Sequence, residues 1–283
     1  YRLPLAFTDK VAVFGLRVEV LDQPEAPKAT SSPLANFTFK SARRGFIAEE
    51  TRKDLAPDTP LAVVIPRGGD SSQVFVEHRD GKDYFFVMVH PRLPRETKAL
   101  PRHLLVVWDA SASARNRNLK RELDLLEAYL RRLGSCQVNL CVFRNVAEPL
   151  RTFRIQDGDT QDLRKHLQAL PLDGATHLGA LELNKVQADE TLVFSDGMNT
   201  FGPGDPQFPD APLLAINSAL IAEHGLLRAL SEGRGGEYLN LQTLSNDEAL
   251  LALKNRPLAF LRATYGANEV EEVYPAAGRV IRG

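Results

Sequence analysis

Apolar runs alternate with amphipathic segments from residue 102 to residue 256, and this alternation constrains the fold more than any other feature of the chain. The apolar runs lack polar alternation, which is typical of strands that a parallel sheet buries on both faces: HLLVVWD (103–109), QVNLCVFR (137–144), ETLVFSD (190–196) and APLLAIN (211–217). The segments with helical periodicity are 119–134, 159–170, 223–236 and 246–256. This alternation predicts a doubly wound α/β domain with a mostly parallel sheet over residues 99–256, and LRTFRI (150–155) is its predicted edge strand.

Residues 1–98 have a different character, because proline and glycine separate short runs of β-forming residues. The runs lie at 11–21, 36–40, 61–66, 72–78 and 84–91. Asp80-Gly81, between the last two runs, is a strong hairpin signal. The pattern predicts a β-sandwich-like segment. Since the tail, 257–283, returns to β character, we predict that it completes this β unit and that the α/β domain is inserted in it or attached to it.

Composition and charge argue against several classes of function. The 283 residues carry a formal net charge of −1, so no overall field favours nucleic acid or an anionic membrane. No apolar run approaches the roughly twenty residues that a membrane-spanning helix needs. Cys136 and Cys141 fall on opposite faces of one predicted strand, which indicates free thiols. The densest basic group is interpreted as the solvated face of a helix: Arg115, Arg117, Lys120 and Arg121.

Two of the apolar strands end in an aspartate, and hydroxyl groups lie nearby in the sequence. Ser111 and Ser113 follow Asp109 in DASAS (109–113), and a glycine-bounded loop presents Thr176 before a predicted helix. In a doubly wound sheet the carboxyl ends of the strands meet at one edge, where ligands bind. Oxygen donors suit Mg²⁺, Mn²⁺ or Ca²⁺, and two neighbouring carboxylates repel each other unless a cation lies between them. The predicted metal site consists of Asp109, Ser111, Ser113, Thr176 and Asp196.

Residues 102–256 resemble a von Willebrand factor type A domain with its metal ion-dependent adhesion site. DASAS resembles the Asp-x-Ser-x-Ser motif, GATHLGAL (174–181) resembles the loop that supplies a threonine, and VFSDG (193–197) resembles the strand that ends in the second aspartate. The resemblance implies that Ser111, Ser113 and, in the ligand-bound state, Thr176 bind the metal directly. It also implies that Asp109 and Asp196 hold the metal largely through water.

The chain departs from many members of this family at Ala112 and Ala114, where they have glycine and methionine. No ligand is lost by this difference, but a Cβ atom at position 112 can alter the loop.

The flanking segments resemble those of inter-alpha-trypsin inhibitor heavy-chain-like proteins. YRLPL (1–5) resembles the last strand of a vault/inter-alpha-trypsin (VIT) domain, and EVEEVYP (269–275) resembles the return strand after the type A domain. The segments that resemble the connection between the two domains are SPLANFTF (32–39), LAPDTPLAVVIP (55–66) and YFFVMVHP (84–91). This resemblance implies an extracytoplasmic parent, secreted, periplasmic or surface-anchored, with a VIT domain upstream. Because the chain opens without an initiator methionine, we expect it to be an excised part of that parent. The excess of arginine over lysine favours a bacterial source.

Two classes of function are compatible with a site of carboxylates and hydroxyls. The first is a non-enzymatic protein-binding module, in which an exposed Asp or Glu of a partner protein completes the coordination of the divalent cation. The second is a Mg²⁺-dependent hydrolase or phosphotransferase that uses the strand-end aspartates. Such enzymes place a second aspartate two positions after the first, where this chain has Ser111, and no histidine or lysine is evidently positioned as a general base. The predicted function is therefore the binding module.

Overall fold

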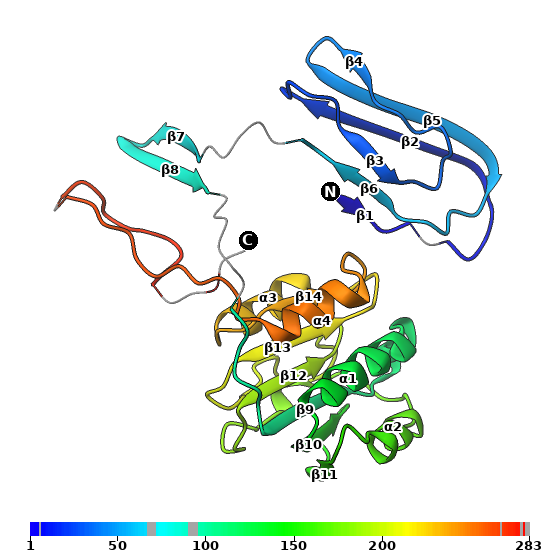
Figure 1. Cartoon of the computed structure of the whole chain (residues 1–283), viewed down its shortest axis with the longest axis vertical. Coiled ribbons are helices and arrows are strands. Elements are labelled where there is room, and N and C mark those ends of the chain that lie inside the picture. Colours follow the sequence, from blue (N-terminus) through cyan, green and yellow to red (C-terminus); the bar gives the residue numbers. More distant parts are fainter. Residues whose placement is uncertain (6, 67–71, 90–95, 267, 278–279, 281–283) are drawn as a thin grey trace. The chain divides into compact units, whose positions relative to one another are not determined.

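The computed structural model describes the chain except for residues 6, 67–71, 90–95, 267, 278–279 and 281–283 (Figure 1). The chain divides into two compact units, Tyr1–Leu93 and Pro94–Gly283. Among the described residues, no helix combines the length and the apolarity that crossing a bilayer requires.

The first unit contains two small antiparallel sheets that share one hydrophobic core. Strands β1 (Arg2–Leu3), β6 (Leu61–Val64) and β3 (Lys28–Ser31) form one sheet in that order. Strands β2 (Val11–Leu21), β5 (Gly45–Leu55) and β4 (Lys40–Ala42) form the other. The core includes Leu61 and Val63 of β6 and Ala48 of β5, so both sheets turn side chains into it.

Strand β5 was missed by the sequence pattern, and the predicted strand 36–40 is wrong except at Lys40, where β4 begins. Most side chains of Glu49–Leu55 in β5 are exposed, which lets the strand carry charged residues such as Arg52 and Lys53 that are unfavourable signals for a strand. Phe37, by contrast, is buried in the core without belonging to a strand, so its β-forming character serves packing alone.

The predicted hairpin is confirmed by strands β7 (Gln73–Arg79) and β8 (Lys82–Met88). Its turn residues, Asp80 and Gly81, have φ values of 53° and 73°, the left-handed region that a type I′ turn requires at both positions. The predicted strand 84–91 extended to His90 and Pro91, which lie outside the described residues. The apolar side chains of this hairpin are exposed on both of its faces.

The second unit contains a six-stranded sheet that is parallel apart from one edge strand, which confirms the mixed α/β prediction (Figure 1). The strand order is β11-β10-β9-β12-β13-β14. The bounds are β9 (His103–Asp109), β10 (Cys136–Phe143), β11 (Arg151–Ile155), β12 (Glu190–Phe194), β13 (Leu213–Asn217) and β14 (Tyr238–Asn240). The chain adds strands on one side of β9 and then, from β12 onward, on the other. The order therefore reverses between β9 and β12, and a doubly wound sheet binds ligands at such a point.

Helices cover the two faces of this sheet unequally. Four α-helices are described: α1 (Leu119–Leu133), α2 (Gln161–Gln168), α3 (His224–Glu232) and α4 (Asn246–Lys254). Apolar residues of α1, α2 and α4 pack against Leu104, Val106 and Trp108 on one face. On the other face, Leu105 and Val107 pack against α3 and against irregular chain around residues 178–183 and 208. The predicted helix after Thr176 is only a short 3-10 helix, Leu178–Ala180, and β14 was missed because it has only three residues.

The segments that lead into and out of the α/β domain lie side by side. Thr97 and Asn255 form an antiparallel bridge, Lys98 N donates to Lys254 O at 3.1 Å, and Arg256 N donates to Glu96 O at 2.8 Å. Beyond them, residues 257–283 are grouped with the α/β unit, and Ala259 bridges Val280 within the tail itself. The pairing of this tail with residues 1–98 stays a prediction.

Candidate metal centre

Asp109 is the last residue of β9, and its side chain is held from several directions. Its Oδ1 accepts a hydrogen bond from Ser111 N at 2.9 Å, and its Oδ2 accepts one from Ser195 Oγ at 2.7 Å. The residue is completely buried. Since both carboxylate oxygens have donors, the carboxylate is fixed in one orientation at the carboxyl end of the central strand.

Three hydroxyl groups from two loops meet beside Asp109. Ser111 Oγ lies 3.1 Å from Ser113 Oγ, and Thr176 Oγ1 donates to Ser111 Oγ at 2.9 Å. Ser111 and Thr176 are each 1% exposed, whereas Ser113 is partly exposed. The structure thus brings together residues that are far apart in the sequence, with a hydroxyl cluster that opens to solvent on the side of Ser113.

Backbone hydrogen bonds hold the two hydroxyl-bearing loops together. Ala112 N donates to Gly174 O at 3.0 Å, and Asp173 N donates to Ala110 O at 3.2 Å. Gly174 has a φ of +70°, and a Cβ atom there would lie 2.7 Å from Asn145 Oδ1, so this position requires glycine.

Thr176 is also tied to the loop that follows β12. Its backbone N donates to Thr200 Oγ1 at 2.9 Å, and its carbonyl oxygen accepts from Thr200 N at 2.9 Å. This reciprocal pair fixes the backbone of Thr176 while its hydroxyl bonds to Ser111.

Asp196, the second carboxylate, is 2% exposed and lies just after β12. Its Oδ1 accepts from Met198 N at 3.0 Å. Phe194 pairs with Trp108 in the sheet, so Asp196 lies one residue beyond the level of Asp109 on the neighbouring strand. Hydrogen bonds link the other four predicted residues, while the strand register brings Asp196 beside them.

A buried ion pair supports the centre from inside the protein. Arg117 Nη2 and Glu122 Oε2 are 2.7 Å apart, and both side chains are 0% exposed. Arg117 Nη1 also donates to the backbone oxygen of Asp109 at 2.9 Å. Burial alone lowers the pKa of Arg117, but the Glu122 carboxylate, with further contributions from Asp109 and Asp196, raises it above its ordinary value. Arg117 is therefore charged and lies near both carboxylates of the centre.

The interpretation of Arg117 as part of a solvated helix face is wrong. Arg117 precedes α1 and turns inward because Glu122, buried on the inner side of α1, needs a cationic partner. Lys120, in contrast, is exposed as predicted and pairs with Asp124 at the surface.

The donor set fits a small divalent cation. Two carboxylates and three hydroxyls are all hard oxygen donors, which suit Mg²⁺, Mn²⁺ or Ca²⁺. The hydroxyl groups of Ser111, Ser113 and Thr176 now bond one another, and each has a lone pair that can bind a cation instead. Among the described residues no group of three or more His, Cys, Asp or Glu side chains could hold a metal, which is compatible with this set because it contains only two such residues.

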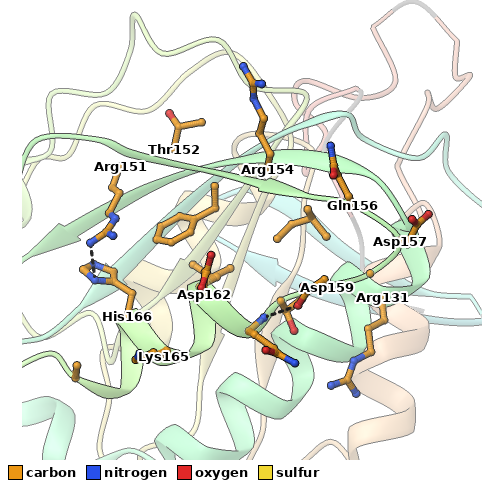
Figure 2. Close-up of a pocket in the computed structure, with 17 residues that line it drawn as sticks. Arg131, Arg151, Thr152, Arg154, Gln156, Asp157, Asp159, Asp162, Lys165 and His166 are labelled. Carbon is orange, nitrogen blue, oxygen red and sulfur yellow. Dashed lines mark hydrogen bonds between the residues drawn. The ribbon is translucent and has the colours of Figure 1, made fainter.

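A hollow lies away from this centre, along the edge strand β11 and helix α2 (Figure 2). Its volume is about 1370 Å³, and none of the five predicted residues lines it. Its cationic side chains do not converge on one point: Arg151 turns toward His166, while Arg131 and Arg154 extend in different directions (Figure 2). The hollow therefore lacks the convergent polar groups of a built ligand site.

Several supporting residues were not predicted as part of the site. Ser195, which orients Asp109, stands directly before Asp196 in the sequence, so the Ser-Asp ending of that strand was an available signal. Asn145 and Thr200 carry no such signal, because their roles depend on contacts between separate loops.

No protein-family model matches the chain, and a comparison of its sequence with curated proteins finds no match. Among solved structures, the chain is similar to an aerotolerance-related membrane protein from Bacteroides fragilis, with a TM-score of 0.40, 11% identity and coverage of 53% of this chain and 95% of that one. It is similar to BatB from Bacteroides thetaiotaomicron, with a TM-score of 0.40, 12% identity and coverage of 53% and 95%. It is also similar to a von Willebrand factor type A structure from Catenulispora acidiphila, with a TM-score of 0.38, 12% identity and coverage of 59% and 43%. With TM-scores of 0.40 or lower, these likenesses carry no weight in the proposed function, which rests on the motifs and on the geometry of the site.

Proposed function

We propose that this protein is a divalent-metal-dependent protein-binding module of the von Willebrand factor type A kind. The proposed metal ligands are Asp109, Ser111, Ser113, Thr176 and Asp196. The observation that supports the proposal most strongly is the meeting of three hydroxyl groups from two separate loops beside the buried Asp109, where Ser111 Oγ lies within 3.1 Å of both Ser113 Oγ and Thr176 Oγ1. Packing alone does not require such a group, because buried hydroxyls need only one partner each.

The chemistry of the ligands favours an acidic partner. The three hydroxyls would bind a divalent cation directly and add no charge, while Asp109 and Asp196 would hold it largely through water, so the ion would keep local positive character and a replaceable coordination position. Ser113, the most exposed of the hydroxyl ligands, opens the cluster to solvent. An exposed Asp or Glu of a partner protein would gain a charge-assisted contact there.

The wider assignment rests on the sequence motifs. We infer that the parent is a VIT-containing protein similar to inter-alpha-trypsin inhibitor heavy chains, and that it acts outside the cytoplasm. The near-neutral charge of the chain gives no support to nucleic acid as a partner.

Isothermal titration with Mg²⁺ and Mn²⁺ tests the metal directly. We expect one ion per chain, and we expect Asp109→Ala to abolish binding without loss of the fold. Asp205→Ala, which removes an equal charge from an exposed position in the loop after β12, is the matched control and should leave affinity unchanged. Undiminished metal uptake by Asp109→Ala would place the metal elsewhere.

Thr176→Ala separates metal binding from partner binding. It removes one hydrogen bond of about 1 kcal/mol and one proposed ligand of the partner-bound state. Thr176→Ala should therefore weaken partner binding, measured by pull-downs in Mg²⁺, more than it weakens metal binding, measured by titration calorimetry. If everything that the wild-type chain recovers also binds in EDTA, the proposed function is wrong. Turnover of generic phosphate esters in Mg²⁺, lost in Asp109→Ala, would instead indicate a hydrolase.

A further inference from the structure

Exposed apolar side chains flank the candidate metal centre on loops that follow three strands. Val146 is 67% exposed, Phe201 53%, Leu220 54% and Ile221 74%. Val146 follows β10, Phe201 follows β12, and the other two follow β13. Because β9, which ends in Asp109, lies between β10 and β12, these side chains lie on loops to both sides of it.

Two of these loops are bonded directly to residues of the centre. Phe201 N donates to Thr176 O at 3.1 Å, so the phenylalanine is adjacent to a proposed ligand. Glu223 N, two residues after Ile221, donates to Asp196 O at 2.8 Å.

The third loop, which carries Val146, is bonded to the residues on either side of Thr176. The side-chain oxygen of Asn145 accepts from Ala175 N at 2.5 Å, and the Asn145 backbone oxygen lies 2.9 Å from His177 Nδ1. The positions of all three loops are thus fixed relative to the centre by hydrogen bonds to its own residues or to the immediate neighbours of Thr176.

We propose that Val146, Phe201, Leu220 and Ile221 form an apolar rim that selects the partner of this site. The inference rests on the proposed function, because the partner's carboxylate enters at the metal centre. The partner is then a protein segment in which an Asp or Glu is flanked by aliphatic or aromatic side chains. Contact with the rim removes exposed apolar surface from water and excludes water from the carboxylate, which strengthens its attraction to the cation.

A displayed library of disulfide-closed seven-residue peptides tests the rim without knowledge of the natural partner. The library is selected on the whole chain in Mg²⁺ and eluted with EDTA. The expected sequences carry a central Asp or Glu with Leu, Ile, Val or Phe beside it. Selection on Thr176→Ala should lose the EDTA-eluted peptides.

The double variant Leu220→Ser/Ile221→Ser measures the contribution of the rim. Because both side chains are mostly exposed, their truncation leaves the fold intact. We expect affinity for a selected peptide to fall about tenfold or more, as loss of two buried apolar contacts implies, with Mg²⁺ affinity unchanged. Leu251→Ser is the matched control, since Leu251 is 41% exposed on α4, and it should change the peptide affinity less than twofold.

Outcomes that differ from these expectations overturn different parts of the proposal. Acidic peptides without apolar neighbours, or equal peptide binding by the double variant, would overturn the rim and leave the proposed function standing. Peptides that bind through the rim but resist EDTA would overturn the carboxylate contact. The absence of any EDTA-sensitive peptide would overturn the proposed function and the rim together.

Discussion

Arg117 and Glu122 form a buried ion pair, and Arg117 donates a hydrogen bond to the backbone oxygen of Asp109 in the candidate metal centre. Glu122 Oε1 also accepts from Ser218 N at 3.1 Å and from Ser218 Oγ at 2.6 Å, so the pair joins the turn before α1 to the loop after β13. Removal of one partner leaves an uncompensated charge in the interior, which is far more costly than loss of a surface pair.

We predict that Arg117→Ala and Glu122→Ala each lower the free energy of unfolding by about 3–5 kcal/mol. Each should also weaken Mg²⁺ binding under conditions where the variant remains folded, because the loop that carries the proposed ligands loses its support. Urea unfolding and titration calorimetry measure the two effects. Arg115→Ala, at an exposed position in the same turn, is the control and should change neither. Normal stability in both variants would show that the pair has no structural role.

The five candidate ligands could be proposed from the sequence because each belongs to a short motif whose own spacing is local. Asp109, Ser111 and Ser113 lie within one turn, and each strand-end motif can be recognised without the rest of the chain. The burial of Arg117 could not be predicted in this way. Whether an arginine near a helix start points outward or inward depends on a partner such as Glu122, whose own burial is decided by how α1 packs on the sheet.

Strand β10 separates two cysteines onto opposite faces of the sheet. Cys136 packs beside the cluster that α1 covers, and Cys141 belongs to the cluster on the other face, which confirms the prediction of free thiols. Burial raises the pKa of Cys136 to about 11. Burial, with a further contribution from Glu148, raises the pKa of Cys141 to about 12. Both thiols are therefore neutral at physiological pH, and the thiolate is the reactive form.

We predict that neither thiol of the native chain reacts quickly with Ellman's reagent at pH 8. The rate should be about a hundredfold or more below that of a free thiol, because the raised pKa values leave little thiolate and the side chains are shielded. Reactivity should rise with pH, first at Cys136, whose pKa is lower and which is partly exposed. Unfolding in urea should make both thiols react with the reagent at once. Rapid release of one equivalent from the native chain at pH 8 would contradict the burial of β10.

At the scale of elements, the strands that the sequence predicted most accurately are those that are most completely buried. The strands β9, β12 and β13 are buried at every position except His103, and their central residues are apolar because helices or irregular chain cover both of their faces. The strand β5 escaped prediction because consecutive exposed residues, 51–54, remove the alternation of buried and exposed side chains. The strand β14 escaped because three residues are too few to show a pattern. No local signal showed that the segment directly after Thr176 would not be an α-helix. Its leucines, Leu178 and Leu181, pack on the sheet as helical residues would, but from irregular chain.

At the scale of the whole molecule, the tail beyond residue 256 decides whether the α/β domain is inserted in the β unit or follows it. We predict that it pairs with residues 1–98, so a chain that ends at Arg256 should show a lower melting temperature for the β unit. The shift should be about 4–8 °C for each kcal/mol of lost stability in a unit of this size. Calorimetry of the whole and truncated chains, with and without Mg²⁺, separates the two transitions. A lower melting temperature for the α/β domain alone would refute the pairing.

The incoming and outgoing segments of the α/β domain are paired at the end of the sheet where its strands begin, away from the candidate metal centre. Lys98 also forms an ion pair with Glu190 at the start of β12, and Tyr129 donates to the same carboxylate at 2.6 Å. A mechanical pull on the two flanking parts of the chain is therefore borne first by residues 96–98 and 254–256. The force then passes from one flanking segment to the other through this pairing of residues 96–98 with 254–256, and not through the six strands of the sheet. For the protein-binding function proposed above, we infer that the metal centre would stay folded, and a partner bound, while the flanking parts of the chain are stretched.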